Sequence, residues 1–264
     1  MSDPAVLYEL RDSVAEITLN RPENRNSMTD DVLEGLRECG RRARDSEARC
    51  VIVTGNGRSF CAGADLRSGL QRDGSEDASH RTPNERSFAM YSPFLSLLQI
   101  EVPVIAAMQG HAIGGGLGLA LVCDLRVANR DARYGANFTR LGLHPGMATT
   151  HILPRLIGLP RAAELLFTGR IISGAEAETI GLANYAVEAE QVLPRAREIA
   201  SEIATAAPIA VRWTKRSLYR NIDWDPVAAA EVEAHAQSRT LETDDAQEGV
   251  RALLEKREPA FQGR

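Results

Sequence analysis

The sequence predicts a mixed α/β fold with a helical C-terminal region, and three observations support this prediction. Residues 102–108 form an apolar run rich in β-branched side chains, which is typical of a buried strand, and three adjacent glycines (114–116) then lead into an apolar segment of helix length. The chain before this stretch has the order strand, strand, helix, strand. From Thr150 onward the apolar spacing is helical.

The first elements follow from their local patterns. Residues 6–10 and 14–19 have the character of strands and are separated by a three-residue turn, so we expect a hairpin. Thr29 is a typical N-cap for the next helix, whose apolar residues share one face: Val32, Leu36, Cys39 and Ala43. Residues 50–54 are the next expected strand. The first third of the chain is therefore predicted to be ββαβ.

The remaining elements repeat this order and then change to helices. Short strands are expected at 124–128 and 134–138, so units of the ββα type recur. Residues 67–87 have a polar composition with little periodicity, which predicts a mobile loop or lid. Helices are expected at 161–167, after Ser173, and at 191–205, 209–220, 226–241 and 245–257, the last opening with Asp244. No linker rich in proline or glycine separates residues 1–190 from 191–264, so one continuous core with an appended helical region is expected.

Composition excludes several functional classes. The chain has 264 residues, of which 44% are hydrophobic and 25% charged, as in ordinary globular proteins. Its net charge of -5 argues against a general nucleic-acid or anionic-membrane binder, although it leaves room for a local basic pocket that binds a phosphorylated ligand. Residues 1–10 lack the basic start and apolar core of a signal peptide, and no apolar run reaches the roughly 18 residues of a membrane span.

The cysteines indicate neither a disulfide framework nor a metal site. They stand at positions 39, 50, 61 and 123, without C-x-x-C spacing, and no group of side chains has the spacing of metal ligands. Reduced, buried thiols in a cytoplasmic protein are therefore expected. The three adjacent glycines have a different implication, because glycine lets the backbone N–H at the start of a helix approach a ligand closely. We expect that ligand to be negative, or to become negative during a reaction.

Several motifs, in order along the chain, resemble the enoyl-CoA hydratase/isomerase family, the crotonases. The two most informative are S-F-C-A-G-A-D-L (59–66) and Q-G-H-A-I-G-G-G-L-G-L-A-L-V-C-D (109–124). The resemblance continues through N-R-P-E-N-R-N-S-M (20–28), L-G-L-H-P-G (141–146), F-T-G-R-I-I-S-G-A-E-A-E-T-I-G-L-A-N (167–184) and E-K-R-E-P-A-F (255–261). No single motif is specific, but the ordered set covers essentially the whole chain.

The resemblance implies a spiral of ββα units, with C-terminal helices that mediate trimers or pairs of trimers. It also implies an acyl-CoA thioester substrate, with coenzyme A entering as part of that substrate and no permanently bound cofactor. By position, the backbone N–H groups of Ala64 and Gly115 would form the oxyanion hole that stabilises a thioester enolate. Contacts to the CoA portion or acyl group would come from these positions: Asn24, Arg25, Ala62, Asp65, Leu66, Gly114, Gly118, Phe138 and Lys256.

Two of these residues have structural alternatives. Lys256 matches a lysine that, in related trimers, reaches the CoA phosphates from the neighbouring subunit, and a solvated lysine at a helix end is an equally good interpretation. Asp65 fits a loop aspartate that accepts hydrogen bonds from nearby backbone N–H groups.

The sequence departs from the family at its catalytic acids. Hydratases of this family use two glutamates to position and activate water, and the corresponding residues here are Gly118 and Phe138. We therefore expect little hydration of crotonyl-CoA. His144 is a candidate base, because imidazole titrates near neutral pH, although a loop histidine beside a proline is more often exposed. Isomerisation, decarboxylation or hydrolysis of an acyl-CoA remain alternatives, as does a non-catalytic acyl-CoA-binding protein.

Overall fold

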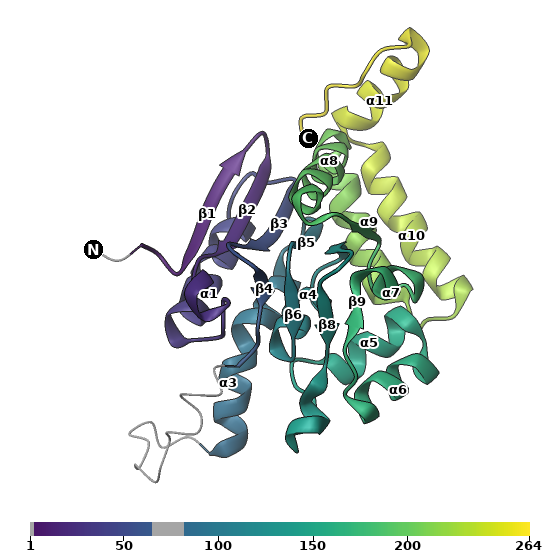
Figure 1. Ribbon diagram of the computed structural model, residues 1–264. Coiled ribbons are helices and arrows are strands. Elements are labelled where there is room, and N and C mark those ends of the chain that lie inside the picture. The colour runs from purple at the N-terminus through teal and green to yellow at the C-terminus, as the bar shows by residue number, and fades with distance from the viewer. Residues whose placement is uncertain (1–2, 65–81) are drawn as a thin grey trace.

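The larger of two β-sheets has six strands. The computed structural model describes residues 3–64 and 82–264. The sheet has the order β1-β2-β3-β5-β7-β10, in which β1 and β2 are antiparallel and all other pairs are parallel (Figure 1). Its strands are β1 (Val6–Arg11), β2 (Val14–Leu19), β3 (Cys50–Gly55), β5 (Val104–Met108), β7 (Leu125–Asn129) and β10 (Tyr185–Val187). The expected hairpin at the N-terminus is confirmed.

The smaller sheet has four strands in the order β4-β6-β8-β9. They are β4 (Ser59–Cys61), β6 (His111–Ile113), β8 (Arg133–Gly135) and β9 (Ile172–Ser173), and the first three run parallel. Successive strands alternate between the sheets, because β3, β5 and β7 join the large sheet while β4, β6 and β8 join the small one. Each pair lies beside the preceding pair in the same direction, so the chain advances as a spiral. The expected repetition of strand pairs is thus confirmed.

Helices connect and cover these strands. Those before the C-terminal region are α1 (Asp30–Arg44), α3 (Pro83–Leu95), α4 (Gly115–Leu121), α5 (Thr149–Ile157), α6 (Leu159–Thr168) and α7 (Gly174–Thr179). The C-terminal region contributes α8 (Val192–Thr205), α9 (Pro208–Asn221), α10 (Pro226–Leu241) and α11 (Asp244–Glu255). Short 3-10 turns occur at Pro22–Asn24, Ser96–Gln99, Asn137–Leu141 and Ala189–Gln191. Figure 1 shows α11 at the end of the molecule opposite α3.

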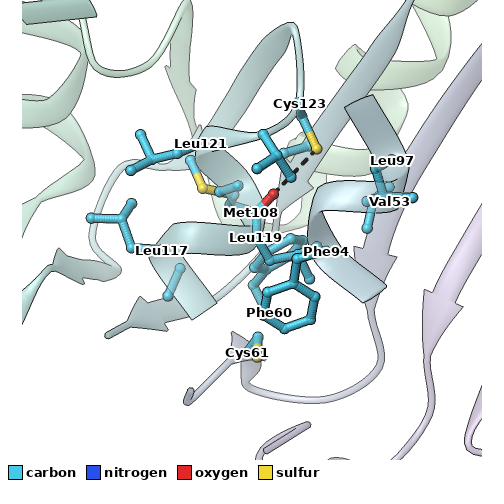
Figure 2. Packing of buried hydrophobic residues seen from close by; sticks show 14 of the residues in the cluster. Val53, Phe60, Cys61, Phe94, Leu97, Met108, Leu117, Leu119, Leu121 and Cys123 are labelled. Carbon is cyan, nitrogen blue, oxygen red and sulfur yellow. Dashed lines mark hydrogen bonds between the residues drawn. The ribbon is translucent and has the colours of Figure 1, made fainter. Parts of the chain in front are cut away.

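The central strands β3 and β5 of the large sheet are buried on both faces. Along β3, Cys50 and Ile52 belong to a cluster with residues of α8, whereas Val51 and Val53 belong to the main core. This alternation explains why the parallel strands are continuously apolar in sequence. The main core also contains α4, whose Leu117 and Leu119 are shown with Phe60 and Cys61 of β4 in Figure 2. Helix α4, whose first residue belongs to the candidate site, is therefore anchored in the packed interior.

Three expectations were wrong in detail. The strand expected at 134–138 ends at Gly135, and a 3-10 turn follows. Residues 67–81 of the loop expected at 67–87 lie outside the described residues, but 83–87 form the start of α3, which Thr82 and Glu85 begin as a capping box. The C-terminal part also contains strands β9 and β10, which are too short to show a period of two.

The start of the last helix also differs from the expectation. Thr243 is the N-cap of α11 and accepts a hydrogen bond from the Ala246 nitrogen at 3.1 Å, so Asp244 is the first helical residue and not the cap. Within the described part of the chain, no helix combines the length and the apolar character needed to cross a bilayer.

Candidate functional site

The candidate site lies where three parallel strands of the small sheet end. Ala64 follows β4, Gly115 follows β6 and Phe138 follows β8, each within three residues of the end of its strand. Because β4, β6 and β8 are parallel neighbours, their C-terminal ends lie at the same edge of the sheet. Residues far apart in the sequence are thereby brought together.

The turns after β4 and β6 are in direct contact. A Cβ atom built on Gly63, which has a φ of +82°, would lie 2.9 Å from the Gly115 nitrogen and 2.6 Å from the Ile113 carbonyl oxygen. A Cβ on Gly116 would lie 1.8 Å from the carbonyl oxygen of Cys61. Such distances are too short for any side chain, so glycine is required at both positions for the turns to meet.

The amide groups of the two turns differ in their hydrogen bonding. Gly114, the N-cap of α4, donates to the Gly135 carbonyl at 2.8 Å and accepts from the Gly118 nitrogen at 3.1 Å. Gly115 is the first residue of α4 and has no intrahelical acceptor for its N–H. Among the described residues, none accepts a hydrogen bond from the amide of Gly115 or from that of the exposed Ala64. Both N–H groups thus lack an acceptor within residues 3–64 and 82–264, with Ala64 exposed and Gly115 buried.

A buried asparagine, Asn26, connects the loop at residues 20–28 to the turn after β4. Asn26 is 0% exposed, and its side-chain nitrogen donates to the Ser59 carbonyl at 2.8 Å and the Phe60 carbonyl at 3.2 Å. The Ala62 nitrogen also donates to the Arg25 carbonyl at 3.0 Å. Asn24, Arg25 and Ala62 are therefore brought together, with the Arg25 side chain exposed. The sequence analysis missed the role of Asn26, although an asparagine in the N-x-N pattern at 24–26 could have been expected to bind backbone groups.

Three other contacts were expected, at Asp65, Leu66 and Lys256. Asp65 and Leu66 lie outside the described residues. Lys256 is the C-cap of α11, in the left-handed conformation with a φ of +54°. Because α11 lies at the end of the molecule opposite α3, Lys256 does not reach the site of its own chain (Figure 1).

Gly118 and Phe138, the two positions at which the sequence analysis expected hydratases to hold glutamate, lie close to other residues of the site. A Cβ on Gly118 would meet the Sδ atom of Met147 at 2.8 Å and its Cβ at 2.9 Å. A Cβ on Gly114 would be 3.9 Å from Cζ of Phe138 and 3.6 Å from Oδ1 of Asn137. Met147 is 2% exposed and was missed, because methionine in a loop carries no functional signal in a sequence.

The loop that contains Met147 also carries the candidate base. His144 is exposed, two residues before the buried Gly146. A Cβ on Gly146 would lie 2.6 Å from the hydroxyl oxygen of Tyr91, a residue of α3 that the sequence analysis missed. Tyr91 is half-buried, and its hydroxyl can donate or accept a proton in a hydrogen bond. The structure therefore offers Tyr91, besides His144, as a polar group at this loop.

Thiol and metal chemistry find no support in the described residues. Burial raises the pKa of the Cys61 thiol to about 12, so it is protonated at neutral pH. Within residues 3–64 and 82–264, no group of three or more His, Cys, Asp or Glu side chains could hold a metal ion.

Comparisons with known proteins relate the chain to one family by its sequence. A model of the enoyl-CoA hydratase/isomerase family matches residues 9–264. The chain is 37% identical over 256 residues to the short-chain-enoyl-CoA hydratase of Clostridium acetobutylicum, covering 96% of this chain and 95% of that protein. It is 39% identical over 261 residues to the mitochondrial enoyl-CoA hydratase domain-containing protein 2 of Bos taurus, covering 95% of this chain and 84% of that protein.

A solved structure gives the same result for the fold. The crystal structure of an enoyl-CoA hydratase from Bacillus anthracis superimposes with a TM-score of 0.90 at 36% sequence identity, covering 98% of this chain and 100% of that chain. The spiral of strand pairs is therefore the crotonase fold. With the family match across nearly its whole length, the chain belongs to the enoyl-CoA hydratase/isomerase family.

Proposed function

We propose that this protein binds an acyl-CoA thioester and stabilises the enolate of that thioester between the backbone N–H groups of Ala64 and Gly115. The observation that carries the proposal is the contact between the two turns, where a Cβ on Gly63 would stand 2.9 Å from the Gly115 nitrogen. Two donors from separate turns can then point at one carbonyl oxygen. Each such donor contributes about 2.7–4 kcal/mol to transition-state stabilisation in known oxyanion holes.

The exposed Arg25 and the turn at Ala62 support a site for the CoA portion. Arg25 has a φ of +60° and its carbonyl accepts from the Ala62 nitrogen, so the Arg25 backbone is held beside the turn that leads to Ala64 and its side chain is exposed there. A cation at this place is suited to the phosphates of CoA. We include Asn24 in this part of the site, because its carbonyl oxygen and its side chain both bind Ser27 and so hold the loop.

The reaction departs from hydration in this proposal. With Gly118 and Phe138 at the glutamate positions, the site lacks the pair of acids that would activate water, while the backbone donors remain. Isomerisation or decarboxylation of an acyl-CoA needs the same enolate and no added water. The absence of both acids also favours a second candidate, a protein that binds acyl-CoA without turnover.

Replacing Ala64 tests the oxyanion hole. Ala64→Pro removes the N–H group, whereas Ala64→Ser keeps it and serves as the matched control. Conjugated acyl-CoA thioesters should show a carbonyl stretching band shifted to lower frequency when bound to the wild type and to Ala64→Ser, and a smaller shift in Ala64→Pro. Any turnover found in a thioester screen should fall about 10²–10³-fold in Ala64→Pro alone. A bound thioester without a band shift in the wild type would refute the proposal, and a shift without any turnover would favour the binder.

The C-terminal helices are proposed to assemble a homotrimer or a dimer of trimers. Large apolar side chains are exposed along α9, α10 and α11: Leu218, Ile222, Val227, Leu241, Val250, Leu253 and Leu254. Exposed apolar side chains that gather into a patch are typical of protein–protein interfaces. In a trimer, Lys256 would reach the site of a neighbouring chain. Sedimentation equilibrium should give the mass of three or six chains, and Leu253→Asp should lower it.

We propose a cytoplasmic location, because all four cysteines are free and buried. Cell fractionation with an antibody to the native chain would place it in the soluble cytoplasmic fraction, and recovery from another compartment would contradict the proposal.

A further inference from the structure

Two methionine side chains, those of Met28 and Met147, pack against the first turn of α4. A Cβ on Gly115 would lie 2.5 Å from the Sδ atom of Met28 and 2.7 Å from Cε of Met147. One turn further along the helix, a Cβ on Gly118 would lie 2.8 Å from the Sδ atom of the same Met147. One methionine side chain thus covers the faces of both glycines, beside the amide that we assign to the oxyanion hole.

The backbone holds Met147 in this position. Met147 and Ala148 have φ values of +58° and +55°, a conformation that residues other than glycine rarely adopt. The turn is closed by Thr149, whose hydroxyl donates to the Gly146 carbonyl at 2.7 Å. Strain of this kind persists only where the surroundings fix it, and it is found often at functional sites. The buried Met147 side chain is therefore fixed against α4 and does not merely fill a loose gap.

A carboxylate at position 118 has no room beside Met147. Its Cβ would already be 2.9 Å from the Met147 Cβ and 3.4 Å from its Cγ, so the near part of the methionine obstructs it as well as the flexible end. A water molecule at the same place would face sulfur and methyl groups, and it would lack the two to four polar partners that a buried water needs. The loss of the acid and the presence of Met147 therefore have the same effect on the site.

We propose that Met147 determines the reaction class of this enzyme by occupying the space in which a hydratase would hold its catalytic carboxylate and water. This inference rests on the proposed function and deepens it. Hydration of an enoyl group by a carboxylate and water at position 118 is excluded by the filled space. The substrate class is then an acyl-CoA whose enolate is formed by proton abstraction or by loss of carbon dioxide and is consumed by protonation at carbon. Phe138, near Gly114, provides a second apolar wall.

Restoring the two acids with and without Met147 tests this role. The Gly118→Glu/Phe138→Glu variant should hydrate crotonyl-CoA no faster than the wild type. Adding Met147→Ala should raise hydration at least 10²-fold over that double variant, because the carboxylate at 118 and the water then have space. Adding Met147→Leu, which keeps the volume and the apolar character, should give no gain. Binding of crotonyl-CoA is measured by calorimetry for each variant, beside circular dichroism as a check of folding.

A stability measurement tests the steric claim separately from activity. Gly118→Ala should lower the urea midpoint of unfolding in the wild-type background, and it should lower the midpoint much less in a Met147→Ala background. Equal losses in the two backgrounds would overturn the steric claim. This test does not need the glutamate variants and therefore decides the claim even when they fail to fold.

The outcomes separate the inference from the proposed function. Fast hydration by the double variant that keeps Met147 would overturn the inference alone. A folded triple variant that binds crotonyl-CoA but gains no hydration would also overturn it. Lack of thioester binding by the wild type would overturn the proposed function, and the inference with it.

Discussion

Replacing Gly116 by alanine should separate the two turns that form the candidate site. The added Cβ would lie 1.8 Å from the carbonyl oxygen of Cys61 and 2.6 Å from its carbonyl carbon, whereas ordinary contacts begin at 3.4 Å. The obstacle is backbone in a residue that is 0% exposed, so it cannot rotate away as the end of a side chain could. Either α4 or the turn after β4 has to move.

The size of the effect follows from what that movement breaks. The turn is held by the hydrogen bond from the Met28 nitrogen to the Gly63 carbonyl at 2.9 Å and by that from the Ala62 nitrogen to the Arg25 carbonyl at 3.0 Å. Losing two such bonds costs about 2 kcal/mol, and overpacking adds about 1–3 kcal/mol. Alanine returns about 1 kcal/mol through its higher helix propensity. The free energy of unfolding should therefore fall by about 2–4 kcal/mol.

Gly249→Ala is the matched control for this experiment. Gly249 is also within a helix, α11, but a Cβ there would meet only the Phe261 ring at 3.5 Å, an ordinary contact. The control should leave the free energy of unfolding unchanged or raise it by up to about 1 kcal/mol. Urea denaturation measures both variants, and thioester binding should weaken in Gly116→Ala alone. If Gly116→Ala is as stable as the control, the turns are not in the contact described above and the argument for the site fails.

Three further predictions concern other parts of the site. Asn26→Ala should lower the free energy of unfolding by about 3 kcal/mol, because it removes a donor to the carbonyls of Asn56, Ser59 and Phe60 and the acceptor of the Arg21 nitrogen; a loss below about 1 kcal/mol in urea would contradict this. If the Tyr91 hydroxyl transfers a proton in the reaction, Tyr91→Phe should reduce any turnover about 10²-fold and leave thioester affinity unchanged. Unchanged kinetics would favour His144 as the proton-transferring group. With a pKa of about 12, the Cys61 thiol is deprotonated in about one molecule in 10⁴ at pH 8. Iodoacetamide at that pH should therefore modify Cys61 after unfolding but not in the native protein, as intact-mass spectrometry can show.

Much of the fold was predictable because its strands and helices have strong periodic patterns. The run at 50–53 is apolar throughout because β3 packs on α8 with one face and on the main core with the other. The strands β9 and β10 escaped prediction because two or three residues cannot display a pattern, and their pairing depends on distant neighbours. The 3-10 turn at 137–141 likewise depends on tertiary contacts.

The candidate site was predictable in part for a related reason. Gly114, Gly115 and Gly116 carry a backbone requirement that is visible in the sequence, as do the small residues around Ala64. Met147 was not predictable, because its importance comes from where its side chain projects and not from its chemistry. The same holds for Asn26, whose partners are carbonyl groups of another loop.

The alternation of strands between the two sheets has a consequence for how such enzymes can diversify. Each coil of the spiral contributes one turn to the candidate site, and in the function that we propose the turns bearing Ala64 and Gly115 act through main-chain atoms whatever their side chains are. The turn bearing Phe138 would act through its side chain. Under this proposal, a substitution in that one turn can change the reaction while the main-chain contacts to the thioester stay the same.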